Sequence, residues 1–447
     1  MPNIQKLFIH DKLQTKAGFL YLVYAVFIVL FLLPLDWSFL KQIFSLKLFS
    51  FQYQDWVYLT TYSPNIIRVP AFGFASYGNW FLLAIIAFAL AYLIKYLKKD
   101  HFTYGFLHEF TTTIIRYRLA IIAIAFGLIK LNHSQLPEPS LSDLNTSYGG
   151  FLPWKLYYVS TGYATSGYVP ILGVVEIIIG LLLLSKKWYG LGAFFAATYF
   201  TNVVIANYAY SIGHHVFSSY VLLLAILLLV KYFWSFFRFF FAEKVAEPFA
   251  EYQFVKSAKC IRFHKLSNVF LALYFSIIAL SVLFNVEKDN FPYSANKQYE
   301  KLSGLYNVES FVIDKDTIPY SITDSIRWQN VVIEKWNTIS IKTAKPAALS
   351  FQRPSLFYAD NEARYYDAIG NGERHFYRFN IDSTNNSIAL QGLLEAGDNY
   401  QFRIKTVGKD TILLDGNILN KPASIVLSKV DKSYLLQKGR RQTNYKI

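Results

Sequence analysis

The sequence predicts a multi-pass α-helical membrane bundle of about seven helices, followed by an antiparallel β-barrel or β-sandwich domain outside the cytoplasm. Three observations carry this prediction. Of the 447 residues, 54% are hydrophobic and 16% are charged, against about 25% charged in ordinary soluble domains. Long apolar runs fill residues 1–285, whereas residues 286–447 alternate apolar and polar residues between turn signals. Lysine and arginine are also distributed unequally between alternate loops of the first part.

The net charge of +15 would by itself favour a nucleic acid or an anionic membrane as partner. Residues 1–285 carry +11 of this charge and residues 286–447 carry +4. Because the excess follows the sides of the predicted membrane, we expect the lipid bilayer as a partner and no nucleic acid. The single cysteine, Cys260, excludes a disulfide framework.

Seven apolar runs approach the length of about 20 residues that crosses a bilayer. The runs are Ala17–Leu35, Trp80–Leu97, Ile114–Leu131, Tyr168–Leu184, Trp188–Ala206, Val216–Trp234 and Leu266–Phe284. Arg116, Arg118 and Lys130 lie near the ends of the third run, where long basic side chains can reach the interface. No small-x-small cleavage site follows the first run, so we expect a retained helix and not a signal peptide.

The loop charges predict the orientation of these helices. With a cytoplasmic N-terminus, seventeen lysine and arginine residues fall in the inner segments and five in the outer segments before residue 286. This is the positive-inside distribution, and seven crossings then place the C-terminal domain outside. Two outer segments, Asp36–Asn79 and Asn132–Gly167, are rich in aromatic or turn-forming residues, and we expect short helices along the outer membrane surface there.

Charged residues at bilayer depth are candidate functional residues because they are costly there. Glu176 shares one helix face with Gly173 and Gly180, which predicts that its carboxylate points into the bundle. The predicted topology puts further polar residues in the same outer half of the membrane. They are Lys130, Asn202, Asn207, His214 and His215.

Two interpretations of this group stay open. Lys130 and Glu176 form an ionisable pocket for a proton or a ligand, with a histidine beside them, or they form a buried pair that only fixes the helix register. The adjacent histidines project about 100° apart on a helix. The chain also has no HExxH motif and no cysteine ligand for a metal. We therefore predict no metal site and no certain cofactor, with a quinone as the one cofactor that the pocket would suit.

Part of the helical region resembles the larger bacterial members of the DoxX-like membrane proteins. The resemblance rests on Arg116-Tyr117-Arg118, Gly127–Leu131, Gln135–Pro139, Gly173–Leu184 and Asn202–Tyr210, and it covers about residues 76–240. It departs at His214-His215, where family members tend to place a lysine. The resemblance implies four core crossings in the cytoplasmic membrane of a bacterium. It also implies a possible redox link, because its namesakes include a membrane subunit of a thiosulfate:quinone oxidoreductase.

The C-terminal region, residues 286–447, predicts an all-β domain. Eight runs with period-2 alternation are separated by turn signals. They are Leu305–Val312, Trp328–Lys335, Thr338–Lys342, Phe376–Ile381, Ser387–Gly392, Tyr400–Thr406, Thr411–Leu414 and Ser424–Ser428. The stretch Leu302–Tyr306 resembles the opening of lipocalin-like barrels. Such a barrel holds one small ligand or is filled by side chains.

No catalytic motif is present in the C-terminal region. The sequence therefore favours a non-enzymatic scaffold or binding module that presents the β-domain to an extracytoplasmic protein or lipid. The alternatives are a quinone-linked subunit of a membrane oxidoreductase, with its pocket around Glu176 and Lys130, and a transporter. A transporter is the least favoured of the three because the chain shows no inverted repeat.

Overall fold

The computed structural model describes most of the chain. It describes residues 16–34, 39–41, 44, 59–64, 66, 75–97, 104–131, 138–163, 167–232, 266, 269–277, 279–280, 297–351, 365–395 and 397–434. These residues form two compact units. One consists of Met1–Leu131 and Ile171–Phe284, and the other of Asn132–Pro170 and Asn285–Ile447. The chain therefore passes from one unit to the other three times.

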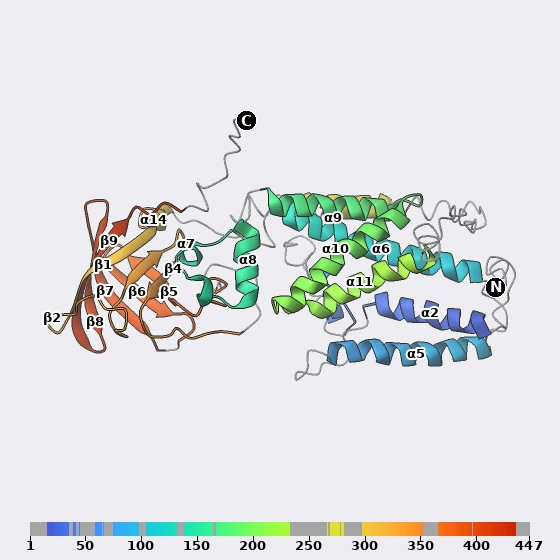
Figure 1. Cartoon of the computed structure of the whole chain (residues 1–447), viewed down its shortest axis with the longest axis horizontal. Helices are drawn as coiled ribbons and strands as arrows, with labels where there is room; N and C mark the ends of the chain where they lie inside the picture. Colours follow the sequence, from blue (N-terminus) through green and yellow to red (C-terminus); the bar gives the residue numbers. More distant parts are fainter. Residues whose placement is uncertain are drawn as a thin grey trace, which may run out of the picture. The chain divides into compact units, whose positions relative to one another are not determined.

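The first unit is helical (Figure 1). Its main described helices are α2 (Lys16–Leu32), α5 (Ala75–Leu97), α6 (Tyr104–Leu131), α9 (Tyr168–Leu184), α10 (Tyr189–Ala209) and α11 (His215–Leu229). These helices coincide with the first six predicted apolar runs. Their shared core contains fully buried side chains from α2, α5, α6 and α11, such as Ile28, Leu83, Leu119 and Leu224.

The predicted bundle of seven membrane helices is not supported. Within the described residues, two helical stretches are long and apolar enough to cross a membrane, Tyr77–Leu97 of α5 and Tyr189–Ala209 of α10. Helices α9 and α11 are apolar but have 17 and 15 residues. At about 1.5 Å per residue they are shorter than a hydrocarbon core of about 30 Å. The seventh run, Leu266–Phe284, is described only in part.

The basic residues Arg116 and Arg118 of α6 are hydrogen-bonded to backbone carbonyls of the helical unit. The Arg116 guanidinium donates to the backbone carbonyls of Leu183 and Leu184 at 3.0 and 2.9 Å. It thereby satisfies two of the carbonyls that the C-terminal end of α9 leaves without helical partners. Arg118 donates to the carbonyls of Thr60 and Tyr62 at 3.1 and 2.7 Å. Both cations therefore have hydrogen-bond partners inside the helical unit.

The second unit contains a closed antiparallel barrel of eight strands (Figure 1). The strands are β1 (Gly304–Ile313), β3 (Asn330–Ile333), β4 (Thr338–Lys342), β5 (His375–Asp382), β6 (Ser387–Gly392), β7 (Asn399–Val407), β8 (Thr411–Ile418) and β9 (Lys421–Val430). Each strand pairs with the next, and pairing of β1 with β9 closes the sheet. The two-residue strand β2 (Asp316–Thr317) forms a hairpin with β1. The predicted β-domain is thus confirmed, and of barrel and sandwich the structure forms the barrel.

The interior of the barrel is filled with hydrophobic side chains. Alternate residues of every barrel strand contribute to one buried core, including Phe311, Ile341, Phe379, Phe402 and Ile425. Period-2 alternation places these residues on one face of each strand. A barrel of this size can enclose a small ligand or be filled by side chains, and this barrel is filled by side chains.

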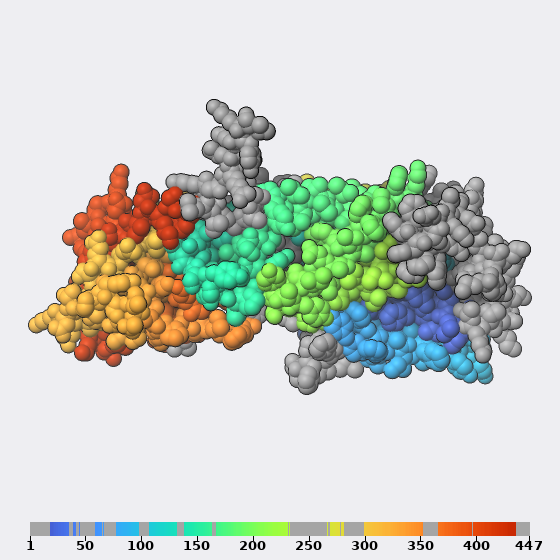
Figure 2. Space-filling view, in the orientation of Figure 1, coloured from blue at the N-terminus to red at the C-terminus, as the bar shows by residue number. Residues whose placement is uncertain are grey.

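A segment from between α6 and α9 covers part of the outer face of the barrel (Figures 1 and 2). It contains α7 (Leu141–Leu144), the 3₁₀ turn η1 (Tyr148–Gly150) and α8 (Pro153–Tyr163). We call residues 138–163 the cover segment. Its backbone pairs with the chain before β5, with Leu152 N–H donating to Gly370 O and Gly372 N–H donating to Gly150 O.

The cover segment lies within Asn132–Gly167, for which the sequence predicted a short helix along the outer membrane surface. The short helix is present as α8, but it packs on the barrel, with Trp154 and Tyr158 buried. Gly370 has φ +75°, and a Cβ there would lie 2.6 Å from the Trp154 ring. Glycine is the residue that adopts this backbone conformation without a steric cost, and its lack of a Cβ also gives the indole room. The other predicted surface segment, Asp36–Asn79, lies largely outside the described residues.

Candidate functional site

The helical unit contains the predicted pair of Lys130 and Glu176. Lys130 lies near the end of α6 and Glu176 in the middle of α9, and the lysine Nζ is 2.8 and 2.7 Å from the two carboxylate oxygens. The side chains are 9% and 2% exposed. Tyr199 of α10 also makes a side-chain hydrogen bond with Glu176. The pair therefore connects three helices at one buried point.

Close contact between α6 and α9 brings the two charges together. A Cβ added at Gly173 would lie 2.6 Å from the carbonyl oxygen of Gly127, and one added at Gly127 would lie 2.6 Å from the carbonyl oxygen of Gly173. These glycines let the two backbones touch, as small residues do between membrane helices. The face of Gly173, Glu176 and Gly180 points into the bundle, as the helical spacing predicted.

The other four candidates have different surroundings. Asn207 is buried at the end of α10, where its Nδ2 donates to Val203 O and its Oδ1 accepts from the backbone N–H of His214. His215 begins α11, with its ring 5.3 Å from that of Tyr208. Asn207 and His214 thus shape the turn between two helices. Asn202 is exposed and does not contribute to a buried pocket.

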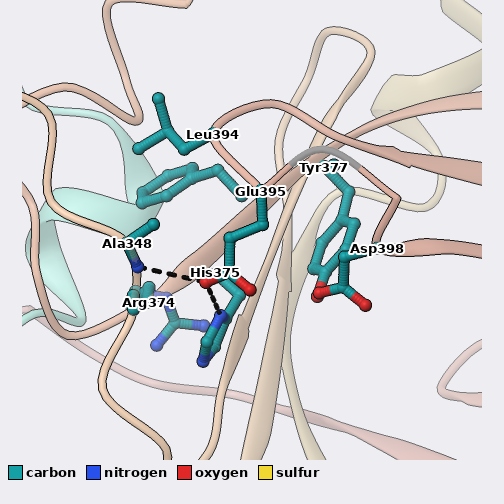
Figure 3. A pocket seen from close by; sticks show the side chains of 10 residues that line it. Ala348, Arg374, His375, Tyr377, Leu394, Glu395 and Asp398 are labelled. Atoms are coloured by element: carbon teal, nitrogen blue, oxygen red, sulfur yellow. Dashed lines mark hydrogen bonds and ion pairs between the residues drawn. The ribbon is translucent and has the colours of Figure 1, made fainter.

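The barrel unit has a second group of polar residues, around a small pocket that is partly open to solvent. Figure 3 shows His375, the first residue of β5, beside Glu395 and Asp398 from the connection between β6 and β7. One ligand atom from each of these three residues lies within 4.8 Å of the other two. This is a set of nitrogen and oxygen donors that could hold a metal ion.

The two ring nitrogens of His375 face different partners. Nδ1 is 3.1 Å from Glu395 Oε1. Nε2 is 3.1 Å from the backbone carbonyl oxygen of Lys345 and 3.2 Å from Thr343 Oγ1. The ring is buried, with its side chain 6% exposed. Its orientation is therefore fixed by contacts at both nitrogens.

The two carboxylates of the pocket are held by donors. Glu395 Oε1 accepts from the Ala348 N–H at 3.1 Å, and Lys345 Nζ lies 3.2 Å from Oε2. Burial raises the pKa of Glu395, but Ala348, Lys345 and His375 together outweigh it and hold the pKa below its usual value. Asp398 Oδ2 accepts from the Tyr377 hydroxyl at 2.7 Å. Burial and this hydrogen bond raise the pKa of Tyr377, so the phenol stays a donor.

A third group of polar residues lies beneath the cover segment. Glu334 is 2% exposed, and it accepts from the N–H groups of Leu141 and Ser142 and from the Ser142 hydroxyl, at 3.2, 2.7 and 2.6 Å. Ser340 connects Ser142 to Arg374, whose Nε donates to Ser340 Oγ at 2.8 Å. A continuous chain of hydrogen bonds therefore runs from Arg374 to Glu334.

Two further carboxylates adjoin this chain. Asp143 lies 3.5 Å from Lys155 Nζ, and Asp367 accepts from the Trp336 indole N–H at 3.2 Å. Burial raises the pKa of Glu334 to about 7, with Asp367 and Asp143 adding repulsion. Burial also lowers the pKa of Arg374 to about 10. We call Asp143, Lys155, Glu334, Asp367 and Arg374 the cover network.

Sequence reasoning found the first group and missed the other two. The helical spacing of Gly173, Glu176 and Gly180 was a local signal. By contrast, His375 is 20 residues from Glu395 and they have no motif in common. Ser340 and Glu334 alternate with core residues, which is typical of a solvated outer face, yet both are buried and both contact Ser142 of the distant cover segment.

Comparisons with protein-family models, curated proteins and solved structures return no match for this chain. The resemblance to the DoxX-like proteins therefore stays a prediction from the residues that carry it.

Proposed function

We propose that this chain is an integral protein of a bacterial cytoplasmic membrane that acts as a non-enzymatic scaffold or binding module. Its helical unit lies in the bilayer, and its barrel unit is presented outside the cytoplasm to a protein or lipid partner. The loop charges and the DoxX-like resemblance support this placement.

The observation that carries the proposal is an apolar stripe on the outside of α5. Its side chains are spaced three or four residues apart and are 53% to 75% exposed; they are Phe81, Ile85, Phe88, Tyr92 and Tyr96. Leu83, Ala87 and Ala91 of the same helix are fully buried. A helix that is apolar on both its buried and its exposed face suits lipid as the outer solvent. In water, a stripe of this kind would be an aggregation site.

Helix α9 supports the same placement. Ile171, Val174, Ile178 and Leu181 are 45% to 61% exposed at spacings of three and four residues. The opposite face of α9 carries Gly173 and Glu176 against α6. Since α9 has 17 residues, a thinned bilayer or flanking polar residues would accommodate its length.

The closed geometry of the Lys130–Glu176 pair supports a structural role over a reactive one. Both carboxylate oxygens contact the same ammonium group, and the pair is almost fully buried. A ligand or proton would have to displace one of these contacts. The filled interior of the barrel likewise favours a partner that binds its surface over a ligand enclosed within it.

Lipid extraction of the purified chain tests the functional part of the proposal against the quinone-linked alternative. The protein is purified in mild detergent, its visible spectrum is recorded, and the quinone in its lipid extract is measured per mole of protein. We expect structural lipid, no chromophore, and the same low quinone content in wild type and in a Lys130→Met, Glu176→Leu double variant. About one quinone per chain that the double variant loses would contradict the scaffold proposal.

A further inference from the structure

We propose that His375, Glu395 and Asp398 form a binding site for a divalent transition-metal ion of the Zn²⁺ type on the barrel unit. The proposal is independent of the scaffold function. It begins from the donor set in Figure 3, where an imidazole and two carboxylates converge at the side of one pocket. Zn²⁺ binds imidazole nitrogen at about 2.0–2.1 Å and carboxylate oxygen at about 2.0–2.2 Å.

The contacts of His375 are the second, independent observation. The Lys345 carbonyl oxygen at 3.1 Å from Nε2 can only accept a hydrogen bond. When Nε2 donates its proton to this carbonyl, Nδ1 directs its lone pair toward Glu395 Oε1 at 3.1 Å. A metal ion between Nδ1 and Oε1 would then be held by both atoms.

The surroundings match the second shell of a metal site. A metal-bound histidine usually donates its other ring N–H to a carbonyl or carboxylate, which fixes the tautomer, and the Lys345 carbonyl occupies that position. The Tyr377 hydroxyl orients Asp398 in the same way, at 2.7 Å from Oδ2. Ligands and supporting groups are thus already arranged on rigid β5 and on the β6–β7 connection.

Small side-chain movements complete the site. Two ligands on one Zn²⁺ are at most about 4 Å apart, and the three atoms here lie within 4.8 Å of one another. Glu395 is partly exposed on a loop, so rotation of its side chain can bring its carboxylate within the distance that one metal ion requires. Lys345, which is 57% exposed, would leave Glu395 Oε2 when the metal binds. The adjoining pocket is partly open to solvent and provides an entry path.

The donor types select among metals. One imidazole nitrogen with two carboxylates suits Zn²⁺ and neighbouring transition ions, whereas Ca²⁺ takes six to eight oxygen ligands and Mg²⁺ retains several waters. We therefore expect Zn²⁺ to bind and Ca²⁺ and Mg²⁺ to bind much more weakly. Because only three protein ligands are present, the fourth position is left to water or to an acidic group of a partner.

Metal binding to the full-length chain in mild detergent tests the site directly. The protein carries a purification tag without histidine, is stripped with chelator, and is titrated with Zn²⁺ alone by calorimetry, with elemental analysis for stoichiometry. We expect one ion per chain and a higher unfolding temperature with Zn²⁺. His375→Gln and Asp398→Asn should each weaken binding at least about 10-fold, as should the orienting variant Tyr377→Phe.

Glu309→Gln is the matched control, because Glu309 is an exposed carboxylate on β1 of the same barrel, and it should bind Zn²⁺ as wild type does. Each variant is also melted without metal, so that loss of binding is separated from loss of fold; Asp398→Asn, on the loop, covers the case in which His375→Gln does not fold. Wild-type protein that binds no Zn²⁺, or folded His375→Gln and Asp398→Asn variants that bind it as wild type does, would overturn the proposal. A proton between His375 and Glu395 would then be the remaining explanation of their contact.

Discussion

The two units handle buried charge in different ways. In the helical unit, the Glu176 carboxylate pairs with the Lys130 ammonium group, so the two charges cancel. In the barrel unit, the cover network places three carboxylates beside two cations. The first arrangement has no surplus charge, whereas the second has one carboxylate more than it can neutralise. From this difference we expect the helical pair to fix a register and the cover network to respond to protons.

The largest expected effect comes from removing one partner of the buried Lys130–Glu176 pair. Glu176→Leu leaves Lys130 buried without its counter-charge, which should cost about 3–5 kcal/mol of stability, whereas the double variant Lys130→Met, Glu176→Leu should stay within about 1 kcal/mol of wild type. Thermal unfolding in mild detergent measures both variants. A double variant as unstable as the single one would show that the pair does more than fix the helix register.

The cover network should show the next largest effect, as a pH dependence. Glu334 has its pKa raised from 4.5 to about 7 in the folded chain, so the folded state holds a proton that the unfolded state releases between these values. Stability from this group is therefore present below about pH 4.5 and is lost as the pH rises to about 7. At about 1.4 kcal/mol per pKa unit the loss approaches about 3 kcal/mol.

Glu334→Gln isolates this contribution, because its amide oxygen can still accept from the Ser142 N–H and hydroxyl, while the side chain does not titrate. From pH 4.5 to 7.5, the unfolding temperature of Glu334→Gln should rise relative to that of wild type. Glu309→Gln, on an exposed side chain, should follow wild type throughout. A difference between wild type and Glu334→Gln that does not change with pH would rule out the proton-responsive network.

Backbone contact in the helical unit is tested by a pair of glycines. Gly173→Ala forces a Cβ to within 2.6 Å of Gly127 O, while a Cβ at Gly78 of α5 meets nothing within 4 Å. We expect Gly173→Ala to destabilise by about 1–3 kcal/mol and Gly78→Ala to be neutral or to stabilise by up to about 1 kcal/mol. Equal melting temperatures for the two variants would mean that α6 and α9 do not touch at this point.

The smallest effect separates the two candidate asparagines. Asn207→Ala removes the hydrogen bonds to Val203 O and to the His214 N–H, and it should lower stability by about 1 kcal/mol. Asn202→Ala, on an exposed position, should change it by less than about 0.5 kcal/mol. The same thermal unfolding assay compares them, and the reverse order would mean that the α10–α11 turn does not depend on Asn207.

Much of this architecture was predictable from local patterns. Six apolar runs became helices, all eight strand predictions match strands, and the spacing of Glu176 with its glycines predicted an inward face. Seven crossings were predicted, but two helical stretches among the described residues are long and apolar enough, because α9 and α11 are apolar but short.

Long-range contacts could not be predicted. Nothing in the sequence near Ser340 or Glu334 shows that residues 138–163 will bury their outward faces, or that His375 will meet a loop 20 residues later. Such residues look solvated until the chain that covers them is placed.

Labelling of single cysteines tests the central claim, that a bilayer-embedded helical unit presents the barrel outside the cytoplasm. Lys409 is exposed in the turn between β7 and β8, so a Cys260→Ser, Lys409→Cys variant reports on the barrel, and wild-type Cys260 reports on the predicted inner loop. Spheroplasts are treated with a membrane-impermeant maleimide, and membranes are washed with alkaline carbonate. We expect Lys409→Cys to be labelled in intact spheroplasts, Cys260 to be labelled only after permeabilisation, and both proteins to stay in the membrane pellet. Release by carbonate, or labelling of Lys409→Cys only after permeabilisation, would contradict the account.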